Sequence, residues 1–393
     1  MSEPEETTTV IIVGAGVAGL TLGNFLLRHG IACTVLEKAS REHVELRQRA
    51  GVIDTRAVRM FRAWGLEDRI IGGVPSHPVL NFRIDGETRA LELAPDDHGD
   101  GRFCPQRVLV MNLINVFVAD GGDLRFDADV ALDNLAGDDR PRVRYRDRSG
   151  QARVIRGDLV AGCDGDHGVS RAAIPGECLT RYSHDYGYAW LTILAAVPAN
   201  HQSMMAIHAR GFAGQFARGP QASRFYLQCP LDSATSQWTD ERIWDELETR
   251  FGEPMATRGQ IVSTQLVPIR SVVYSPMRYG RLYLLGDAAH IIPPMSAKGM
   301  NLALHDAEVF ATAVLRDQHH GDSSLLDDYS STCLRHVWNY QALAASWTEL
   351  IHDAGDASYQ GEFRRQIARA DLARLFASPA ANRLFSEFMA GLN

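Results

Sequence analysis

The stretch VIIVGAGVAG, residues 10–19, decides how this chain begins to fold. Its first four residues, 10–13, are apolar and β-branched, which predicts a short buried strand. A glycine-rich turn follows, and residues 20–29 then show the apolar periodicity of a helix that Gly30 ends. Residues 32–36 predict a second buried strand. This strand–helix–strand unit is the usual start of a doubly wound sheet.

The glycines of the turn, Gly14, Gly16 and Gly19, have the spacing GxGxxG. The first permits a tight turn, the second lets the backbone approach a pyrophosphate, and the third lets helix and strand pack closely. The helix that follows offers free N–H groups to phosphates. Glu37 closes the second strand, where an acid accepts hydrogen bonds from a ribose. The segment predicts a dinucleotide site, and the alternative of a glycine turn without a ligand stays open.

Length, charge and cysteine content bound the class of protein. The 393 residues are too many for one typical core, so we expect two or three packed units. The formal net charge of −8 gives no sign of binding to nucleic acids or anionic membranes. The six cysteines form no CxxC pair and no histidines cluster at ligand spacing, which argues against disulfides or a metal site. The acidic N-terminus is unlike a signal peptide, and no apolar run is long enough for a membrane span, so we expect a soluble cytoplasmic protein.

Two later segments favour FAD as the dinucleotide. One is CDGDHGVSR, residues 163–171, and the other is GRLYLLGDAAHIIPPMSAKGMN, residues 280–301. In the second, a buried strand ends beside Asp287, which can bind a ribityl hydroxyl. The helix that opens at residues 298–301 can direct its first amides at a flavin. The residues alone leave open that Asp287 is a helix cap and that His290 is a packed loop residue.

Together these motifs resemble the class A flavoprotein monooxygenases, and the chain resembles the 4-hydroxybenzoate hydroxylase family along nearly its whole length. The supporting stretches are residues 47–52, 161–165, 210–213, 268–271 and 286–301. The resemblance implies that NAD(P)H reduces FAD, that O₂ adds to the reduced flavin at C4a, and that the hydroperoxide transfers OH to an electron-rich ring. The expected partners are a small aromatic carboxylate, O₂ and a second copy of the chain in a homodimer.

The expected fold is α/β with mixed α+β character. A Rossmann-like FAD-binding domain accompanies a substrate domain built on an antiparallel sheet, which one helix near residues 240–251 interrupts, and a C-terminal helical region. We expect the FAD-binding domain at residues 1–77, 96–180 and 276–300, the substrate domain at 78–95 and 181–275, and the helical region at 301–393.

The resemblance also assigns residues to the flavin. Arg47, Arg49 and Gln106 match flavin-contacting positions. The other residues that it places against FAD, besides the glycines and Glu37, are Asp164, Asp287, Lys298, Gly299, Met300 and Asn301.

Basic residues are the candidates for the nicotinamide cofactor. Arg49, His167 and Arg270 match positions linked to it, and cations suit a phosphorylated dinucleotide. Lys38, near the end of the second strand, suits a 2′-phosphate, so we expect NADPH in preference to NADH, with NADH still possible. A solvated basic face is the alternative for each of these residues.

Four residues carry the expected substrate chemistry. Arg218 matches the carboxylate clamp of the family, where a guanidinium makes a bidentate pair with a benzoate. Tyr226 matches a neighbouring tyrosine on the same carboxylate. Pro294 matches the residue whose backbone carbonyl lies near the reacting substituent, and His77 matches the outer histidine of a proton relay. Pro294 and His77 are therefore the catalytic candidates.

Three positions depart from the family pattern. Met205 and Met389 stand where two tyrosines normally connect the substrate phenol to the histidine, and Phe216 stands where a serine helps to bind the carboxylate. The alignment leaves Ala206 as the alternative to Met205. Methionine usually fills cores, which is the plain reading of both residues. If they line the pocket, an aminohydroxybenzoate such as 3-amino-4-hydroxybenzoate is the favoured substrate type.

Other functions stay open. They are a 4-hydroxybenzoate 3-hydroxylase proper, a flavin oxidase, dehydrogenase or halogenase, and a non-catalytic flavin-binding protein. The tryptophan pair of the halogenases is not seen. The exact benzoate, the position hydroxylated and the choice between hydroxylation and oxidative decarboxylation are not fixed by these residues.

Overall fold

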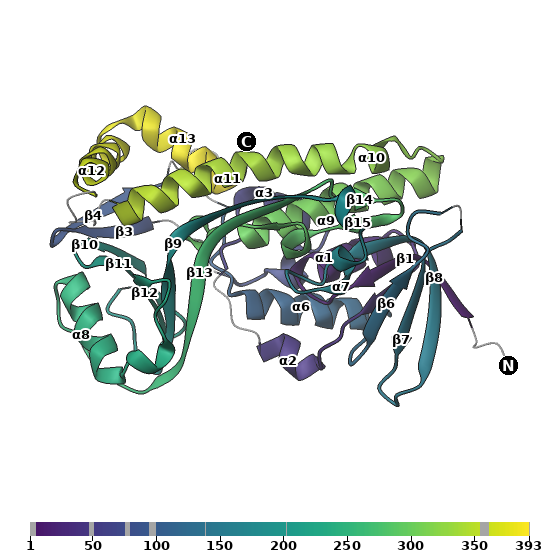
Figure 1. Cartoon of the computed structure of the whole chain (residues 1–393), viewed down its shortest axis with the longest axis horizontal. Helices are drawn as coiled ribbons and strands as arrows, with labels where there is room; N and C mark the ends of the chain where they lie inside the picture. Colours follow the sequence, from purple (N-terminus) through teal and green to yellow (C-terminus); the bar gives the residue numbers. More distant parts are fainter. Residues whose placement is uncertain are drawn as a thin grey trace.

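The computed structural model describes residues 5–46, 51–74, 79–93, 100–137, 139–201, 203–353 and 361–392. It contains two sheets with helices around them, as Figure 1 shows. The expected mixed architecture, with a parallel sheet, an antiparallel sheet and a helical C-terminal part, is confirmed.

The first sheet is mainly parallel and has the order β14-β15-β8-β1-β2-β5, with β6 and β7 continuing from β8. Its strands are β1 (Glu5–Val13), β2 (Cys33–Leu36), β5 (Asp123–Arg125), β6 (Asp129–Asp133), β7 (Arg142–Arg146), β8 (Ala152–Gly162), β14 (Arg278–Tyr279) and β15 (Leu282–Leu284). Strand β1 begins earlier than its apolar run predicts, because its polar first half pairs with β8 at the edge of the core.

The glycine turn lies between β1 and α1 (Val17–Arg28) and meets the expected constraints. Gly14 has φ +106°, and a Cβ there would lie 2.4 Å from the carbonyl oxygen of Cys163. A Cβ at Gly19 would lie 2.1 Å from the Gly14 carbonyl oxygen, so only glycine lets this helix pack against the turn. The sequence and the packing therefore agree on why glycine occupies these positions.

The second sheet has the order β16-β13-β9-β12-β11-β10-β3-β4 and is antiparallel except where β10 runs parallel to β3. Its strands are β3 (Val79–Ile84), β4 (Glu87–Glu92), β9 (Thr180–Ala195), β10 (Ser203–His208), β11 (Gly211–Ala217), β12 (Ser223–Pro230), β13 (Ile261–Ser275) and β16 (His290–Ile291). The long strands β9 and β13 extend from this sheet toward β14 and β15 of the first (Figure 1). The helix expected near residues 240–251 is α8 (Asp240–Phe251), which packs against β10 and β11.

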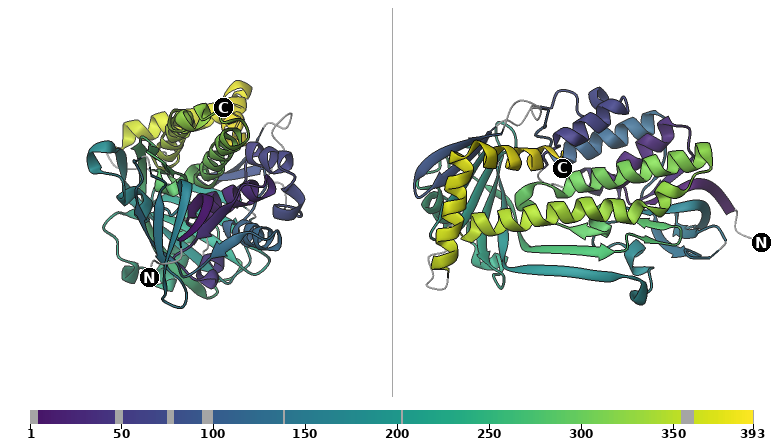
Figure 2. Two further views of the ribbon diagram at one scale, coloured as in Figure 1. Left: turned by 90° about the vertical axis from the view of Figure 1, so that its right-hand side faces the viewer. Right: turned by 90° about the horizontal axis from the view of Figure 1, so that it is seen from above.

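Helices cover both sheets. Besides α1 and α8 they are α2 (Arg41–Leu46), α3 (Thr55–Ala63), α4 (Glu67–Ile70), α6 (Gln106–Ala119), α7 (Val169–Ala172), α9 (Gly299–His320), α10 (Ser324–Asp327), α11 (Tyr329–Asp353), α12 (Glu362–Ala377) and α13 (Pro379–Ala390). Helix α9 packs against α1, and α11 lies beside α9 and continues to α12 (Figure 2). The expected domain limits stay a prediction. No helix in the described ranges is long and apolar enough to cross a membrane.

Candidate active site

A cavity of about 1000 Å³ lies between the two sheets. The turn after β1, the ends of β2 and β8, and the loop after β15 form its wall on the side of the first sheet. Strands β9 to β13 form the opposite wall, and the start of α9 and the end of α13 also reach it. Residues far apart in the sequence therefore meet in one chamber.

Most residues expected at the site line this cavity. They are Gly14, Gly16, Glu37, Lys38, Gln106, Asp164, His167, Met205, Phe216, Arg218, Tyr226, Arg270, Asp287, Pro294, Gly299, Met300 and Met389. Three expected residues, Gly19, Lys298 and Asn301, are not among the lining residues. Arg47, Arg49 and His77 lie outside the described residues.

The dinucleotide end of the cavity fits a flavin nucleotide. A Cβ at Gly16 would meet only one atom within 4 Å, at 3.9 Å, so a side chain there would stand in the cavity beside the N-terminus of α1. The carboxylate of Glu37 accepts hydrogen bonds of 2.8 Å from the amides of Ala15 and Ala39, which fix it at the end of β2. Its remaining lone pairs can accept hydroxyl hydrogen bonds from a ribose.

Asp164, at the end of β8, adds an incompletely satisfied group to this end. Its Oδ2 accepts a 2.8 Å hydrogen bond from the amide of Ser170, while Oδ1 is buried with no partner among the described residues. Burial raises the pKa of this carboxyl. A Cβ at Gly168 would lie 2.0 Å from the carboxyl carbon of Asp164, so only glycine admits this arrangement. Buried oxygens of this kind ordinarily have a partner, which a polar ligand would provide.

Lys298 and Asn301 hold protein segments together. The Nζ of Lys298 donates hydrogen bonds to Asp54 Oδ2 at 3.1 Å and to the carbonyl of Met389 at 2.7 Å. Asn301 accepts a bond from the amide of Asp54 and donates to the carbonyls of Val52 and Ala297. The Asp54 carboxylate and backbone carbonyls bind these two side chains, and neither residue lines the cavity. Spacing within residues 298–301 gave no sign of this.

Behind the loop of Asp287 lies a buried ion pair. His290 Nε2 lies 2.7 Å from Asp306 Oδ2, which also accepts a 2.8 Å hydrogen bond from the amide of Gly286. Burial disfavours the charged form of both groups. Each charge nevertheless stabilises the opposite charge on its partner, so the pKa of His290 is raised and the pKa of Asp306 is lowered. His290 is thus a packed residue, on strand β16 and not in a loop, and it anchors the loop that presents Asp287.

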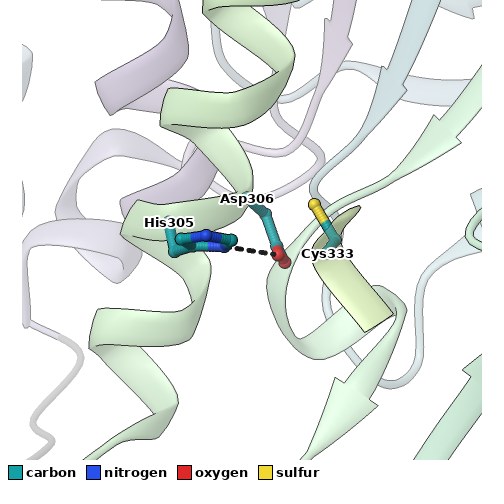
Figure 3. Close-up of side chains that lie close together, drawn as sticks. All are labelled: His305, Asp306 and Cys333. Atoms are coloured by element: carbon teal, nitrogen blue, oxygen red, sulfur yellow. Dashed lines mark ion pairs between the residues drawn. The ribbon is translucent and has the colours of Figure 1, made fainter. Parts of the chain in front are cut away.

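Asp306 also belongs to a group with His305 and Cys333, in which one potential ligand atom of each residue lies within 4.8 Å of the other two (Figure 3). His305 Nδ1 lies 3.9 Å from Asp306 Oδ1. These residue types can hold a metal ion. Because Cys333 comes from α11 and the other two from α9, their spacing in the sequence gave no signal. Because Asp306 already forms the ion pair with His290, we do not assign a metal-binding role to this group.

Arg218 lies at the other end of the cavity. Its Nη1 donates to the carbonyl of Ala217 at 3.1 Å, and its guanidinium lies 5.0 Å from the centre of the Phe103 ring. Its Nη2 is buried and has no hydrogen-bond partner among the described residues, and no acidic side chain there forms an ion pair with the guanidinium. Burial lowers its pKa. A buried cation without a counter-ion is a ready binding site for an anionic ligand.

The strand register explains which side chains accompany Arg218. Met205, Gly214 and Tyr226 face one another across β10, β11 and β12 and therefore share one face of the sheet. Ala206 points to the other face and packs in the core cluster that includes residues of α8. Met205, and not Ala206, is thus the cavity residue. The rings of Phe216 and Tyr226 meet edge to face at 5.7 Å.

Several lining residues were missed by sequence reasoning. They are Trp190, Thr192, Arg224, Gln265, Trp347 and Ser386. Arg224 donates to the hydroxyl of Thr192 at 3.2 Å. Strand alternation with Tyr226 could have placed Arg224 on the cavity face, because the two are separated by one residue on β12. Trp347 and Ser386 come from α11 and α13, and nothing in their local sequence indicates the cavity.

Two of the residues expected to hold the nicotinamide cofactor, His167 and Arg270, both lie beside Asp166. Arg270 forms an ion pair with Asp166, and Arg171 also bonds to Asp166. The side chain of His167 is 91% exposed, and its Nε2 lies 3.8 Å from Asp166 Oδ2. Asp166, which the sequence did not single out, therefore partly neutralises the positive charge of Arg171 and Arg270.

Comparisons with known proteins agree with this geometry. The sequence family described as FAD binding domain matches residues 7–344. The chain is 31% identical over 392 residues to p-hydroxybenzoate hydroxylase from Acinetobacter baylyi, covering 98% of this chain and 95% of the relative. It is also 31% identical to 3-(3-hydroxy-phenyl)propionate/3-hydroxycinnamic acid hydroxylase from Mycolicibacterium smegmatis, over 84% of this chain and 58% of the relative. Among solved structures, p-nitrophenol 4-monooxygenase from Pseudomonas putida has a TM-score of 0.85 at 19% identity, with 99% and 100% of the chains covered.

The fold, the cavity and the sequence relationship define a class A flavoprotein monooxygenase, an FAD-dependent enzyme that hydroxylates aromatic compounds. Within that class, the chain belongs to the FAD binding domain family and to the family of p-hydroxybenzoate hydroxylase.

Proposed function

We propose that this enzyme uses NADPH and O₂ to hydroxylate a hydroxy- or amino-substituted benzoate, with 3-amino-4-hydroxybenzoate as the favoured substrate type. The observation that carries the proposal is Arg218, a half-buried arginine at the cavity wall whose buried Nη2 has no acidic partner among the described residues. A carboxylate in front of it would complete a charge-assisted pair. Tyr226, on the next strand, is in position to donate a hydroxyl hydrogen bond to the same carboxylate. Phe216 stands where the family has a serine, so an aromatic ring edge takes the place of that hydroxyl.

The flavin would lie along the glycine turn, Glu37, Asp164 and Asp287, with Gln106 and the start of α9 completing its site. The chemistry that FAD supplies when bound is acceptance of hydride from a reduced nicotinamide and activation of O₂. The side chains of this protein bind and orient the ring and exclude water from it. The backbone of Pro294, between the flavin loop and α9, would face the substituent at the reacting carbon.

The preference for NADPH is part of the same proposal. Lys38 follows β2 and lines the cavity, where its ammonium suits a 2′-phosphate, and Arg270 with His167 would bind further phosphate oxygens. Steady-state kinetics with both cofactors test it: kcat/KM should be higher with NADPH. Equal or better efficiency with NADH contradicts this part of the proposal and leaves the proposed aromatic substrate unchanged.

We also propose that the protein is a homodimer. Light scattering of the protein as it elutes from a sizing column would show its mass.

A panel of substituted benzoates tests the substrate. NADPH consumption, peroxide release and product mass should together single out an aminohydroxybenzoate as the compound that is both consumed and converted. Well-coupled conversion of 4-hydroxybenzoate would instead assign the activity named for the Acinetobacter relative. Activity only with phenylpropionates would move the substrate to the class named for the Mycolicibacterium relative, and no stimulation by any aromatic acid would contradict the proposal.

A further inference from the structure

The chain has only two lysines, Lys38 and Lys298, among its 40 basic residues counted as lysine and arginine. Lys298 is buried, with 2% of its side chain exposed. Its ammonium lies between the carboxylate of Asp54, the carbonyl of Met389 and the face of Tyr340, whose centre is 5.1 Å away. A compact ammonium with three donors fits such a site, whereas the planar guanidinium that this chain uses elsewhere does not.

The carbonyl that Lys298 binds belongs to the last turn of α13. The last carbonyls of a helix have no partner within the helix, and a cation at that end is stabilised by the helix dipole. Helix α13 brings Ser386, Met389 and Ala390 to the cavity wall. The ammonium thus holds the helix at the residue whose side chain reaches the substrate end.

Asp54 is itself held in place by contacts that do not involve Lys298. Its carboxylate accepts a 2.9 Å hydrogen bond from the amide of Ala57 and caps α3, and its own amide donates to Asn301. Gly391, the residue after α13, has φ +78°, and a Cβ there would lie 2.5 Å from Asp54 Oδ2. Only glycine therefore lets the end of the chain come this close to the acid.

We propose that Lys298 is a positioning residue that, paired with Asp54, fixes α13 as the closing wall of the substrate end of the cavity. Without the ammonium, Asp54 Oδ2 and the carbonyl of Met389 would each lose a hydrogen-bond donor in a buried place, and the wall would open to water. Water entering an aromatic hydroxylase during turnover diverts oxygen to peroxide. The role in turnover rests on the proposed function, whereas the attachment of α13 does not.

Hydrogen exchange of the FAD-loaded enzyme without substrate tests the attachment directly. In Lys298→Met, amides of residues 386–392 should exchange about tenfold faster or more than in the wild type, because the wall opens locally. The KM for the aromatic substrate and the fraction of NADPH lost as peroxide should rise, while FAD stays bound. Lys298→Arg should not restore the wild-type exchange rate.

The matched control is Arg56→Met. Arg56 is a half-buried cation of the same neighbourhood, which bonds to Glu308 and to the carbonyl of Asn301 but is not seen to contact α13 in the described residues. Its loss should leave exchange of residues 386–392 unchanged. If both variants raise the exchange rate of residues 386–392 equally, Lys298 acts only through its charge and the positioning role is wrong. Unchanged exchange in Lys298→Met also overturns the proposal.

A second variant covers the case in which Lys298→Met does not fold. Gly391→Ala keeps the ammonium and forces the end of α13 away from Asp54, so it should raise the same exchange rates and the same peroxide fraction. Wild-type exchange in Gly391→Ala also contradicts the proposal. If exchange rises but no aromatic acid is converted by the wild type, the attachment of α13 stands and the proposed function fails.

Discussion

The indole Nε1 of Trp190 donates a 2.8 Å hydrogen bond to Nε2 of His352, a fully buried histidine on α11. Because an indole nitrogen only donates, Nε2 must be unprotonated, and the proton of the ring lies on Nδ1, which donates to the carbonyl of Thr348 at 2.6 Å. The two bonds fix a neutral histidine in one tautomer. Through them, α11 holds the tryptophan that lines the cavity next to Tyr226, whose ring centre is 5.1 Å away.

This pairing makes stability depend on pH. Burial lowers the pKa of His352 from 6.5 to about 4. Between these values the unfolded chain binds a proton that the folded chain does not, so stability is full above pH 6.5 and falls as the pH drops toward 4. The expected loss is about 1.4 kcal/mol per pH unit inside that window. Unfolding free energies at pH 7, 6 and 5 would show the slope.

His352→Gln is the control for that slope. The amide can still accept from Trp190 but does not titrate, so the acid slope should decrease by about one proton. His336, whose pKa burial lowers to about 3, should keep contributing in the variant. An unchanged slope would show that His352 is already protonated or already exposed in the folded protein.

Local sequence patterns predicted the parts of the site in which neighbours along the chain act together. The glycine turn, the acid at the end of β2 and the loop before α9 are contiguous motifs, and residues of each line the cavity. Their contacts with a flavin stay a prediction. Lys298 illustrates the limit. Its position in the motif suggested a flavin contact, whereas its partner Asp54 is 244 residues away in the sequence. The tertiary fold, and not the local sequence, therefore determines whether the ammonium of Lys298 contacts Asp54 or a flavin.

The substrate end shows the same limit in another form. Strand alternation places Met205 and Tyr226 on one face once the register is known, but the sequence left Met205 and Ala206 as alternatives, since one residue of register moves every side chain to the opposite face. Trp190 and His352 are 162 residues apart, and neither lies in a motif. Helix packing, which the periodicity of α11 does not specify, brings them together.

Glu37 should contribute strongly to FAD retention. In Glu37→Ala the amides of Ala15 and Ala39 lose their acceptor, and the ribose would lose its own. Leaving such groups unpaired costs about 1–3 kcal/mol, which corresponds to roughly tenfold to hundredfold weaker binding. Titration of the apoprotein with FAD, followed by flavin fluorescence, measures it. The exposed Glu42 on α2 is the control, and Glu42→Ala should bind FAD as the wild type does.

Arg218 should determine affinity for the carboxylate of the substrate. Removing one partner of a buried ion pair typically costs about 3–5 kcal/mol, so Arg218→Ala should raise the dissociation constant by roughly two to four orders of magnitude. FAD should remain bound, since Arg218 directly follows β11 of the second sheet and the expected flavin residues lie on the side of the first sheet. Difference spectroscopy of the flavin on titration with substrate gives both values. If the amide analogue of the substrate binds the wild type as tightly as the acid, Arg218 has another role.

Met205 and Met389 should make ring activation independent of a relay of tyrosines. Both residues line the cavity, and a thioether neither donates nor relays a proton and accepts hydrogen bonds only weakly. A plain phenol bound there is therefore hard to deprotonate through protein groups and is a poor nucleophile. An ortho-amino phenol is already electron-rich and does not need the relay. A water bridge is the other route, but methionine provides poor partners for a buried water.

The consequence is a difference in coupling between two substrates of the wild type. With 4-hydroxybenzoate, NADPH consumption should produce mainly peroxide, whereas an aminohydroxybenzoate should give product in near-equal amount to the NADPH consumed. The measurement compares NADPH, peroxide and product for each compound in parallel. Met205→Leu is the control: it keeps an apolar side chain of similar size and should leave both ratios as they are. Efficient, well-coupled hydroxylation of 4-hydroxybenzoate by the wild type would show that this pocket deprotonates a phenol without the tyrosines, and the substrate assignment drawn from the methionines would then be wrong.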